Sequence, residues 1–354
     1  MDLIPDLPPD ISRECLIRVS HSQFPKIASI CKAWKTEIEQ PEFLRLRKTA
    51  GFGQRLIVMA QARVEPKRTN GLSKFCYPVY RFSFLDLGSG NWDELPSIPG
   101  LRDGLPYFCR MAAVGSELVV MGGLKPGTWG VSRSVYVFNF LSGSWRRGVD
   151  MPGVRRLFFG CGSDHDRMVY VAGGHDSDKK ALRSAMAYDV AKDEWSQLPD
   201  MARERDECKG IFQRGKFHVI GGYCTEMQGR FERSAEQFDV AAWRWNNVEE
   251  EFLEVNTCPQ TCSAGDEMDM YMRSGGDVVA LKGNTWKTVE KLPAEVGNTA
   301  YITTWPGKLM AIGSSRFGEP HRAYVLDLKK IVWTEMETPE KFSGHIQSGC
   351  YIEI

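Results

Sequence analysis

The chain lacks a charge imbalance, a long apolar run and closely paired cysteines. Its 354 residues include 45 basic and 45 acidic side chains, so no net charge favours nucleic acid or an anionic membrane as a general partner. Residues 1–6 are acidic and contain proline, unlike a secretory signal, and apolar runs stop well short of the about 20 residues that a membrane span needs. We therefore expect a protein of the cytoplasm, the nucleus or both, with no nucleic-acid or membrane partner.

The ten cysteines are scattered and form no Cys-x-x-Cys pair. Cys109, Cys161 and Cys208 recur about 50 residues apart at apolar strand starts, and we interpret them as small buried hydrophobic residues in a reducing compartment. Cys258 and Cys262 lie close together, but no histidine cluster completes the four ligands of a structural zinc. We predict neither a metal nor another cofactor.

Catalytic motifs are also missing. The six histidines are spread over the chain, and there is no Gly-x-Ser-x-Gly, phosphate-binding glycine loop or His-Glu-x-x-His stretch. No cysteine has a neighbouring histidine or basic pattern that would activate its thiolate. We predict a protein without catalytic activity of its own.

What the chain does contain is a pattern repeated about every 50 residues. An apolar strand ends in Gly-Gly and is followed by Arg-Ser, by an aromatic residue with Asp or Asn, and by tryptophan. The second glycines, Gly123, Gly174 and Gly222, recur 51 and 48 residues apart, and the tryptophans recur 50 and 50 residues apart at Trp145, Trp195 and Trp245. A unit of this length with several short strands is typical of a blade of a kelch-type propeller.

Degenerate copies of the pattern flank the best ones. We predict a mainly β protein, with a six-bladed kelch-type β-propeller over residues 54–354 and repeats at approximately 54–100, 107–150, 157–200, 207–250, 260–292 and 298–337. The first repeat has no strand ahead of it, and residues 345–354 form a spare strand. Pairing the two would close the ring and remove exposed sheet edges.

Residues 1–48 have a different character, with no glycine before Gly51. Their apolar residues fall at helical spacings, which predicts a small helical module. We expect Asp10 or Ser12 to cap its first helix and Pro25 to begin the second. Since about 40 residues bury too little surface to stand alone, an apolar face should remain for a partner.

The module resembles an F-box in its Leu7-Pro8 opening, its Cys31-Lys-Ala-Trp34 segment and its closing Pro41-x-Phe43. The resemblance implies a three-helix hook that docks on a Skp-type adaptor, which is held in turn by a cullin-RING core. Cys15 stands where the family more often has a bulkier aliphatic residue, which should weaken the contact slightly. The adaptor-facing or hook-core positions map onto Leu7, Pro8, Ile11, Leu16, Val19 and Trp34.

With its repeats, the chain resembles plant F-box/kelch-repeat proteins from residue 3 to its end. Residues 151–161 and 200–208 resemble most a subgroup that directs the ubiquitination of phenylalanine ammonia-lyase in phenylpropanoid metabolism or acts on cytokinin response regulators. The resemblance implies the substrate-recognition subunit of an SCF-type (Skp-cullin-F-box) E3 ubiquitin ligase, which promotes target ubiquitination and proteasomal degradation. The alternative is a kelch scaffold that binds a partner without degrading it, or a protein that sequesters the adaptor.

Substrate contacts are expected in the least repetitive loops of blades two to four, because arginine and aromatic side chains dominate interfaces. Trp129 is the strongest candidate, since its glycine-rich insertion has no copy in neighbouring blades. Arg155 and Arg205 could instead brace loops against nearby carboxylates. The full set is Trp129, Arg155, Arg156, His175, Arg203, Arg205, Tyr223 and Arg230.

Overall fold

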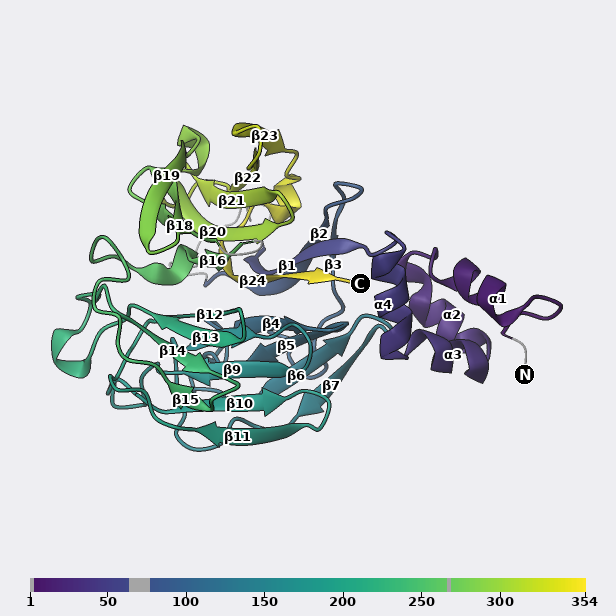
Figure 1. The fold of residues 1–354 in the computed structure, drawn as a ribbon, viewed down its shortest axis with the longest axis horizontal. Helices are drawn as coiled ribbons and strands as arrows, with labels where there is room; N and C mark the ends of the chain where they lie inside the picture. The colour runs from purple at the N-terminus through teal and green to yellow at the C-terminus, as the bar shows by residue number, and fades with distance from the viewer. Residues whose placement is uncertain (1–2, 64–76, 266–268) are drawn as a thin grey trace, which may run out of the picture.

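The computed structural model describes residues 3–63, 77–265 and 269–354 and shows a β-propeller with a group of helices at one end (Figure 1). Residues 64–76 and 266–268, which belong to the predicted first and fifth repeats, lie outside the described residues. The helices of residues 3–49 are α1 (Pro9–Leu16), η1 (His21–Gln23), α2 (Phe24–Ile30), α3 (Lys32–Ile38) and α4 (Pro41–Thr49).

The module contains four α-helices where the sequence predicted three. Cys31 adopts an extended backbone with φ −157° and ends α2, and its Sγ accepts a hydrogen bond from Trp34 N that caps α3. The first helix follows Pro8 without a side-chain cap, so neither Asp10 nor Ser12 has the expected capping role. Pro25 lies in the first turn of α2, as predicted.

The described strands form six four-stranded antiparallel sheets, each running outward from the central channel as strands a to d. Blade one contains β24 (Ile346–Glu353), β1 (Arg55–Ala62), β2 (Tyr80–Asp86) and β3 (Trp92–Glu94). Blade two contains β4 (Arg110–Val114), β5 (Glu117–Met121), β6 (Val135–Asn139) and β7 (Ser144–Gly148). Blade three contains β8 (Gly160–Ser163), β9 (Met168–Ala172), β10 (Ala185–Asp189) and β11 (Glu194–Leu198).

The remaining three blades complete the ring. Blade four contains β12 (Lys209–Gln213), β13 (Lys216–Ile220), β14 (Ala235–Asp239) and β15 (Arg244–Trp245). Blade five contains β16 (Ser263–Ala264), β17 (Met270–Ser274), β18 (Asp277–Lys282) and β19 (Thr285–Lys291). Blade six contains β20 (Asn298–Trp305), β21 (Lys308–Ser314), β22 (Arg322–Asp327) and β23 (Val332–Met336).

The C-terminal strand closes the propeller. β24 pairs antiparallel with β1 in a register that includes Leu56–Ile352 and Val58–Cys350. It therefore supplies the innermost strand of blade one, which confirms the prediction that residues 345–354 fill the vacancy in the first repeat.

The repeated tryptophans fasten each blade to its neighbour. Every strand d carries one whose indole Nε1 donates to a backbone carbonyl of the preceding blade or of the loop that leaves it. The hydrogen bonds run from Trp92 to Glu337, Trp145 to Pro96, Trp195 to Val149, Trp245 to Pro199, Trp286 to Phe252 and Trp333 to Lys291, over 2.7–3.0 Å. The first of these hydrogen bonds joins blade one to the last blade, so the tryptophan hydrogen bonds link all six blades in a closed ring.

The double glycines follow strand b, where a second backbone passes close by. Gly174 has φ +80°, and a Cβ built on it would lie 2.2 Å from Leu157 O. Gly123 and Gly222 have the same left-handed conformation and face the equivalent carbonyls of Tyr107 and Asp206. A side chain at these positions would be strained and would collide with main chain.

A shared core joins the helical module to the propeller. Leu16, Phe24 and Phe43 pack in one cluster with residues of blades one and two, including Leu56 and Phe140. Because the two parts share buried side chains, they form one body rather than two domains on a linker.

Buried Arg47 of α4 crosses the joint. Its Nε donates to Ile354 O at 3.0 Å, and its Nη1 donates to Ile17 O and Val19 O. Burial lowers the pKa of this guanidinium to about 10. The guanidinium of Arg47 also lies 5.1 Å from the ring centroid of Phe24. Together with the hydrogen bonds, this contact makes one side chain connect the helices with the C-terminal end of the chain.

Candidate functional site

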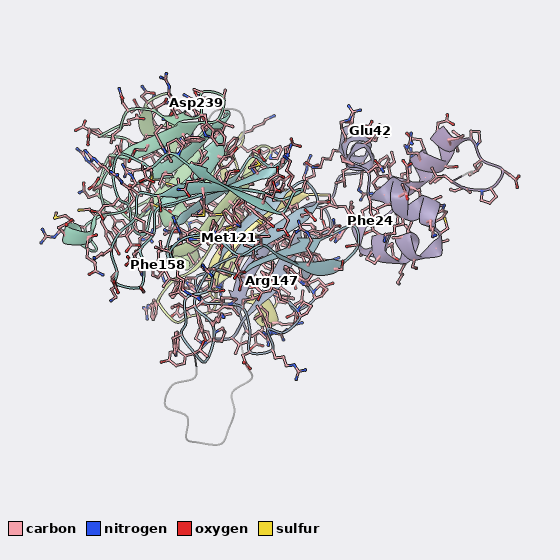
Figure 2. The ribbon with its side chains drawn as sticks, turned by 90° about the horizontal axis from the view of Figure 1, so that it is seen from below. Phe24, Glu42, Met121, Arg147, Phe158 and Asp239 are labelled. Atoms are coloured by element: carbon pink, nitrogen blue, oxygen red, sulfur yellow. The ribbon has the colours of Figure 1, made fainter. Side chains whose placement is uncertain are left out.

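The propeller has two unlike ends. In antiparallel blades, the a–b and c–d turns lie at one end and the b–c and d–a loops at the other. The helical module occupies the first end, where Pro25 lies against the c–d turn at Gly143 and His21 contacts Phe140. The opposite end, which we call the free face, presents the b–c and d–a loops. Figure 2 shows Phe158 of this face well away from Phe24 of the module.

Apolar side chains are exposed on the helical module. Leu7, Pro8 and Ile11 are exposed around the start of α1, Ile11 to 46%. Ile30 at the end of α2 is 63% exposed, although its helical spacing resembles that of a core residue. Figure 1 places α1 at the tip of the molecule, on the side away from the propeller. These side chains are therefore accessible to a partner.

The other module residues singled out from the sequence face inward. Leu16 is buried in the shared core, and Val19 and Trp34 pack partly buried against it. Trp34 also donates its indole N–H to Leu3 O, which ties the N-terminal segment to α3. The predicted set thus divides into three exposed residues and three that shape the module.

Two of the predicted substrate-binding arginines are structural, which corrects the prediction for Arg156 and agrees with the alternative that Arg205 braces loops. Arg205 is 1% exposed and donates to Gly221 O, Ser234 O and the Glu236 carboxylate, the last at 3.1 Å. Arg156 is equally buried and donates to Gly173 O and Ser184 O. Arg156, rather than Arg155, is therefore the counterpart of Arg205. Neither Arg156 nor Arg205 reaches the surface.

Two other predicted substrate-binding residues, His175 and Tyr223, are also largely buried. His175 Nδ1 lies 2.8 Å from Asp206 Oδ2. Tyr223 is buried and donates its hydroxyl to Glu207 at 2.9 Å. Burial, together with the hydrogen bond to Glu207, raises the pKa of Tyr223 well above its usual value. His175 lies in the b–c loop of blade three and Tyr223 in the b–c loop of blade four. Their partners Asp206 and Glu207 both lie in the d–a loop that enters blade four, so both side chains hold this loop.

The accessible candidates on the free face are Trp129, Arg155 and Arg230, while Arg203 is half-buried. Trp129 is 43% exposed and stacks on Tyr107, with ring centroids 5.2 Å apart. Arg155 donates to Val131 O, and Arg203 pairs with Glu232 and Glu250. Trp129, which also meets Tyr77 edge-on, is therefore an exposed ring held in place, and Arg230 is an exposed cation.

Sequence reasoning missed two aromatic residues on this face. Phe108 is exposed and Phe158 half-exposed, and their ring centroids are 4.9 Å apart at the mouth of the central channel. Both have the left-handed backbone, with φ of 60° and 53°, that is uncommon for bulky residues. Their recurrence just before strand a in two blades was a usable signal.

Within residues 3–63, 77–265 and 269–354, no group of three or more His, Cys, Asp and Glu side chains is arranged to hold a metal ion. No helix in the same ranges is long and apolar enough to cross a membrane. Buried Cys262 donates its thiol to Met272 Sδ at 3.6 Å.

Six blades and an N-terminal helical module define the class: a propeller that shares a buried core with a small group of helices. Comparison with protein families matches the F-box domain at residues 4–46 and the Kelch motif at residues 106–152 and 156–202. The fold also resembles the structure of YjhT, with a TM-score of 0.58 at 14% identity, over 73% of this chain and 91% of that one.

Close relatives share the whole organisation. The Arabidopsis thaliana F-box/kelch-repeat proteins At1g15670 and At1g80440 are 51% and 50% identical, and each alignment covers 100% of both chains. A third, At2g44130, is 34% identical over 75% of this chain and 69% of its own length. The chain belongs to the plant F-box/kelch-repeat family.

Proposed function

We propose that the chain is the substrate-recognition subunit of an SCF-type ubiquitin ligase. The F-box module binds a Skp-type adaptor on a cullin-RING core, and the free face of the propeller binds a target protein. Target lysines are then held close to the conjugating enzyme that carries ubiquitin, which raises their effective concentration. The target is ubiquitinated and then degraded by the proteasome. In this proposal the chain contributes no catalytic group.

The observation that carries the proposal is the separation of two accessible surfaces on one rigid body. Ile11 and Ile30 are exposed on the module, and Trp129 is exposed on the free face. Arg47 and the shared core fix the module to blades one and two. A rigid bridge of this kind keeps two bound proteins at a set distance, as transfer between them requires. Family membership supports the same function.

The finer parts of the proposal come from the sequence resemblance. Phenylalanine ammonia-lyase and cytokinin response regulators are the first target classes to test, and both stay predictions. A reducing location, in the cytoplasm or nucleus, is part of the proposal. The nine described cysteines are free, which is compatible with it.

Adaptor docking is tested with the purified full chain and a plant Skp-type adaptor. Ile11→Asp and Ile30→Asp each place a charge on an exposed apolar position, so folding should be retained. We expect adaptor affinity to fall by at least about tenfold, since hot-spot losses reach about 2 kcal/mol or more. The control is Val332→Asp, exposed on β23, which should bind the adaptor normally. Unchanged binding by both module variants would overturn docking through this surface.

A further inference from the structure

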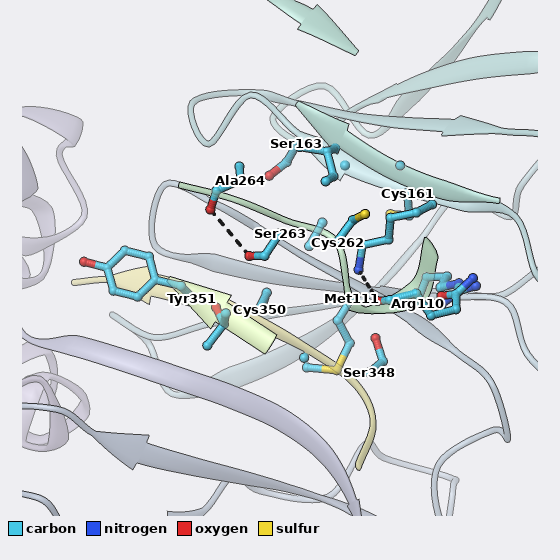
Figure 3. A pocket seen from close by; sticks show the side chains of 18 of the residues that line it. Arg110, Met111, Cys161, Ser163, Cys262, Ser263, Ala264, Ser348, Cys350 and Tyr351 are labelled. Carbon is cyan, nitrogen blue, oxygen red and sulfur yellow. Dashed lines mark hydrogen bonds between the residues drawn. The ribbon is translucent and has the colours of Figure 1, made fainter. Parts of the chain in front are cut away.

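The central channel holds a cavity of about 210 Å³. The innermost strands all run in the same direction, from the free face toward the F-box module. Figure 3 shows Arg110 at one end of the pocket and Tyr351 at the other, with Cys161, Cys262 and Met111 between them. The walls are mostly thiols, small residues and backbone, so charged side chains stand out.

Two cations meet at the free-face end of this channel. Arg110 and Lys209 are the first residues of β4 and β12, at the same blade position as Gly160 of β8. Arg110 donates to Phe159 O and to Gln260 Oε1, each at 3.0 Å. Lys209 Nζ donates to the backbone oxygen of the same Gln260 at 3.1 Å. Both cations keep further N–H donors for a ligand.

No carboxylate in the described part of the chain forms an ion pair with either cation. Burial lowers the pKa of Arg110, and burial together with the Arg110 charge lowers the pKa of Lys209 to about 8. Two like charges in a half-buried site without a counter-charge destabilise the fold. Gly160 shows that blade packing does not need a cation at this position. An anion would relieve the repulsion.

The rim next to the cations is aromatic. Phe108 lies two residues before Arg110, and its N–H is held by Gln347 Oε1 at 2.8 Å. Phe158 contacts Phe108 on one side and His175 on the other, with the latter ring centroids 5.6 Å apart. The two strained phenylalanines thus present apolar surface at the free-face end of the innermost strands, two residues before Arg110 of β4 and Gly160 of β8.

We propose that the free-face mouth of the channel binds an organic carboxylate. Its negative group lies between Arg110 and Lys209, and its apolar or aromatic body contacts Phe108 and Phe158. Two sources carry this chemistry: a free small acid, and an aspartate or glutamate side chain of a bound protein next to an apolar residue. The inference extends the proposed function, because such a ligand would lie on the target-binding face.

The test measures binding to the purified full chain by ligand-observed NMR. The probes are benzoate against neutral benzamide, and acetyl-Asp-Phe-amide against acetyl-Asn-Phe-amide. We expect at least one acid to bind about tenfold more tightly than its neutral partner, the scale of a hydrogen bond to a charged group. Tighter binding of benzoate identifies a small acid as the source, and tighter binding of the aspartyl peptide identifies a protein side chain.

Variants locate the site. Lys209→Met and Arg110→Gln should each weaken acid binding by about tenfold or more. The control Lys287→Met, on exposed β19, should leave it unchanged. Equal binding of acids and amides by the unaltered chain, or full acid binding by both variants, would overturn the inference. The acid–amide comparison decides even where a variant fails to fold.

Adaptor binding is measured on the same preparations. If the adaptor binds and the acids do not, the carboxylate site is refuted while the proposed function stands. If the acids bind and the adaptor does not, the carboxylate site stands and the ligase function fails.

Discussion

At the scale of single residues, a shift of one position along a loop decides whether an arginine is exposed for binding or buried in a structural role. Arg155 and Arg156 are neighbours, yet the first is exposed and the second is buried and donates to two backbone carbonyls. The sequence paired Arg155 with Arg205 because they are 50 residues apart. The d–a loop is one residue shorter before blade four, so the hydrogen bonds pair Arg156 with Arg205 instead.

Arg205→Met should destabilise the protein strongly. It leaves Glu236, which is fully buried, without its cation, and losing one partner of a buried pair costs about 3–5 kcal/mol. The measurement is the free energy of unfolding in denaturant. Arg155→Met, at an exposed side chain, is the control and should stay within about 0.5 kcal/mol of the unaltered chain. A loss below about 1 kcal/mol for Arg205→Met would refute the structural role.

Lys209 gives the stability a specific pH dependence. Its pKa in the folded chain is about 8, below the unfolded value of 10.5, so protonation opposes folding. The cost is full below pH 8 and disappears as pH rises past 10.5. Groups that influence its charge are Arg110 of β4, Cys161 of β8, and Cys258 and Cys262 around η3 (Pro259–Thr261).

Lys209→Met should therefore raise the melting temperature relative to the unaltered chain at pH 7, and the difference should shrink between pH 8 and 10.5. Melting curves across this range, recorded without added anions, provide the measurement. Lys287→Met should show no such trend. A Lys209→Met difference that is independent of pH would contradict the lowered pKa.

At the scale of elements, each blade is specified by its own pattern and by what it offers the next blade. Tryptophan at strand d and double glycine after strand b are both visible in the sequence. These residues recur because they make contacts between different elements: Trp195 donates to Val149 O, and Gly174 leaves room for Leu157 O. Such contacts between segments far apart need the folded ring to be seen.

Gly174→Ala should be more damaging than Gly215→Ala, although both glycines have left-handed backbones with φ of +80° and +69°. At Gly215 nothing lies within 4 Å of the new Cβ, so only the conformational cost of about 1 kcal/mol applies. At Gly174 a clash with main chain adds about 1–3 kcal/mol. Denaturant unfolding of both variants measures the difference, and equal losses would show that the close approach is unimportant.

The strand count and ring closure could be predicted because a missing strand at the first repeat matched a spare one at residues 345–354. The break between α2 and α3 could not, since apolar spacing from Ile30 to Trp34 continues through it. Nor could spacing show that Leu16 is buried while Ile11 is exposed. Those outcomes depend on which helix face meets the propeller. The pairing of the channel cations Arg110 and Lys209 could not be predicted, because the innermost strands converge only in three dimensions.

At the scale of the whole molecule, the joint between module and propeller decides whether the chain is a bridge or two tethered parts. Arg47 connects α4, the loop after α1 and the C-terminal residue, all in the shared core. Its donors and its burial leave little room for independent motion of the module. The joint therefore fixes the distance between the exposed surface of the module and the free face.

Arg47→Met should loosen the joint without unfolding the outer blades. We expect faster amide hydrogen exchange in α4 and at the end of β24, with protection in blade four unchanged, because local openings follow lost local contacts. Arg45→Met, exposed on the same helix and paired only with Glu42 among the described residues, is the matched control. Unchanged exchange in Arg47→Met would show that packing alone fixes the module.

The measurement that tests the bridge most directly is affinity capture from plant cells with proteasomes inhibited, comparing the intact chain, Leu7→Ala/Pro8→Ala and Trp129→Ala. We expect the module variant to lose adaptor and cullin but to retain a second set of proteins, and Trp129→Ala to do the reverse. The retained set should accumulate only while proteasomes are blocked. If the intact chain never captures the adaptor, the ligase function is contradicted and the propeller acts as a scaffold.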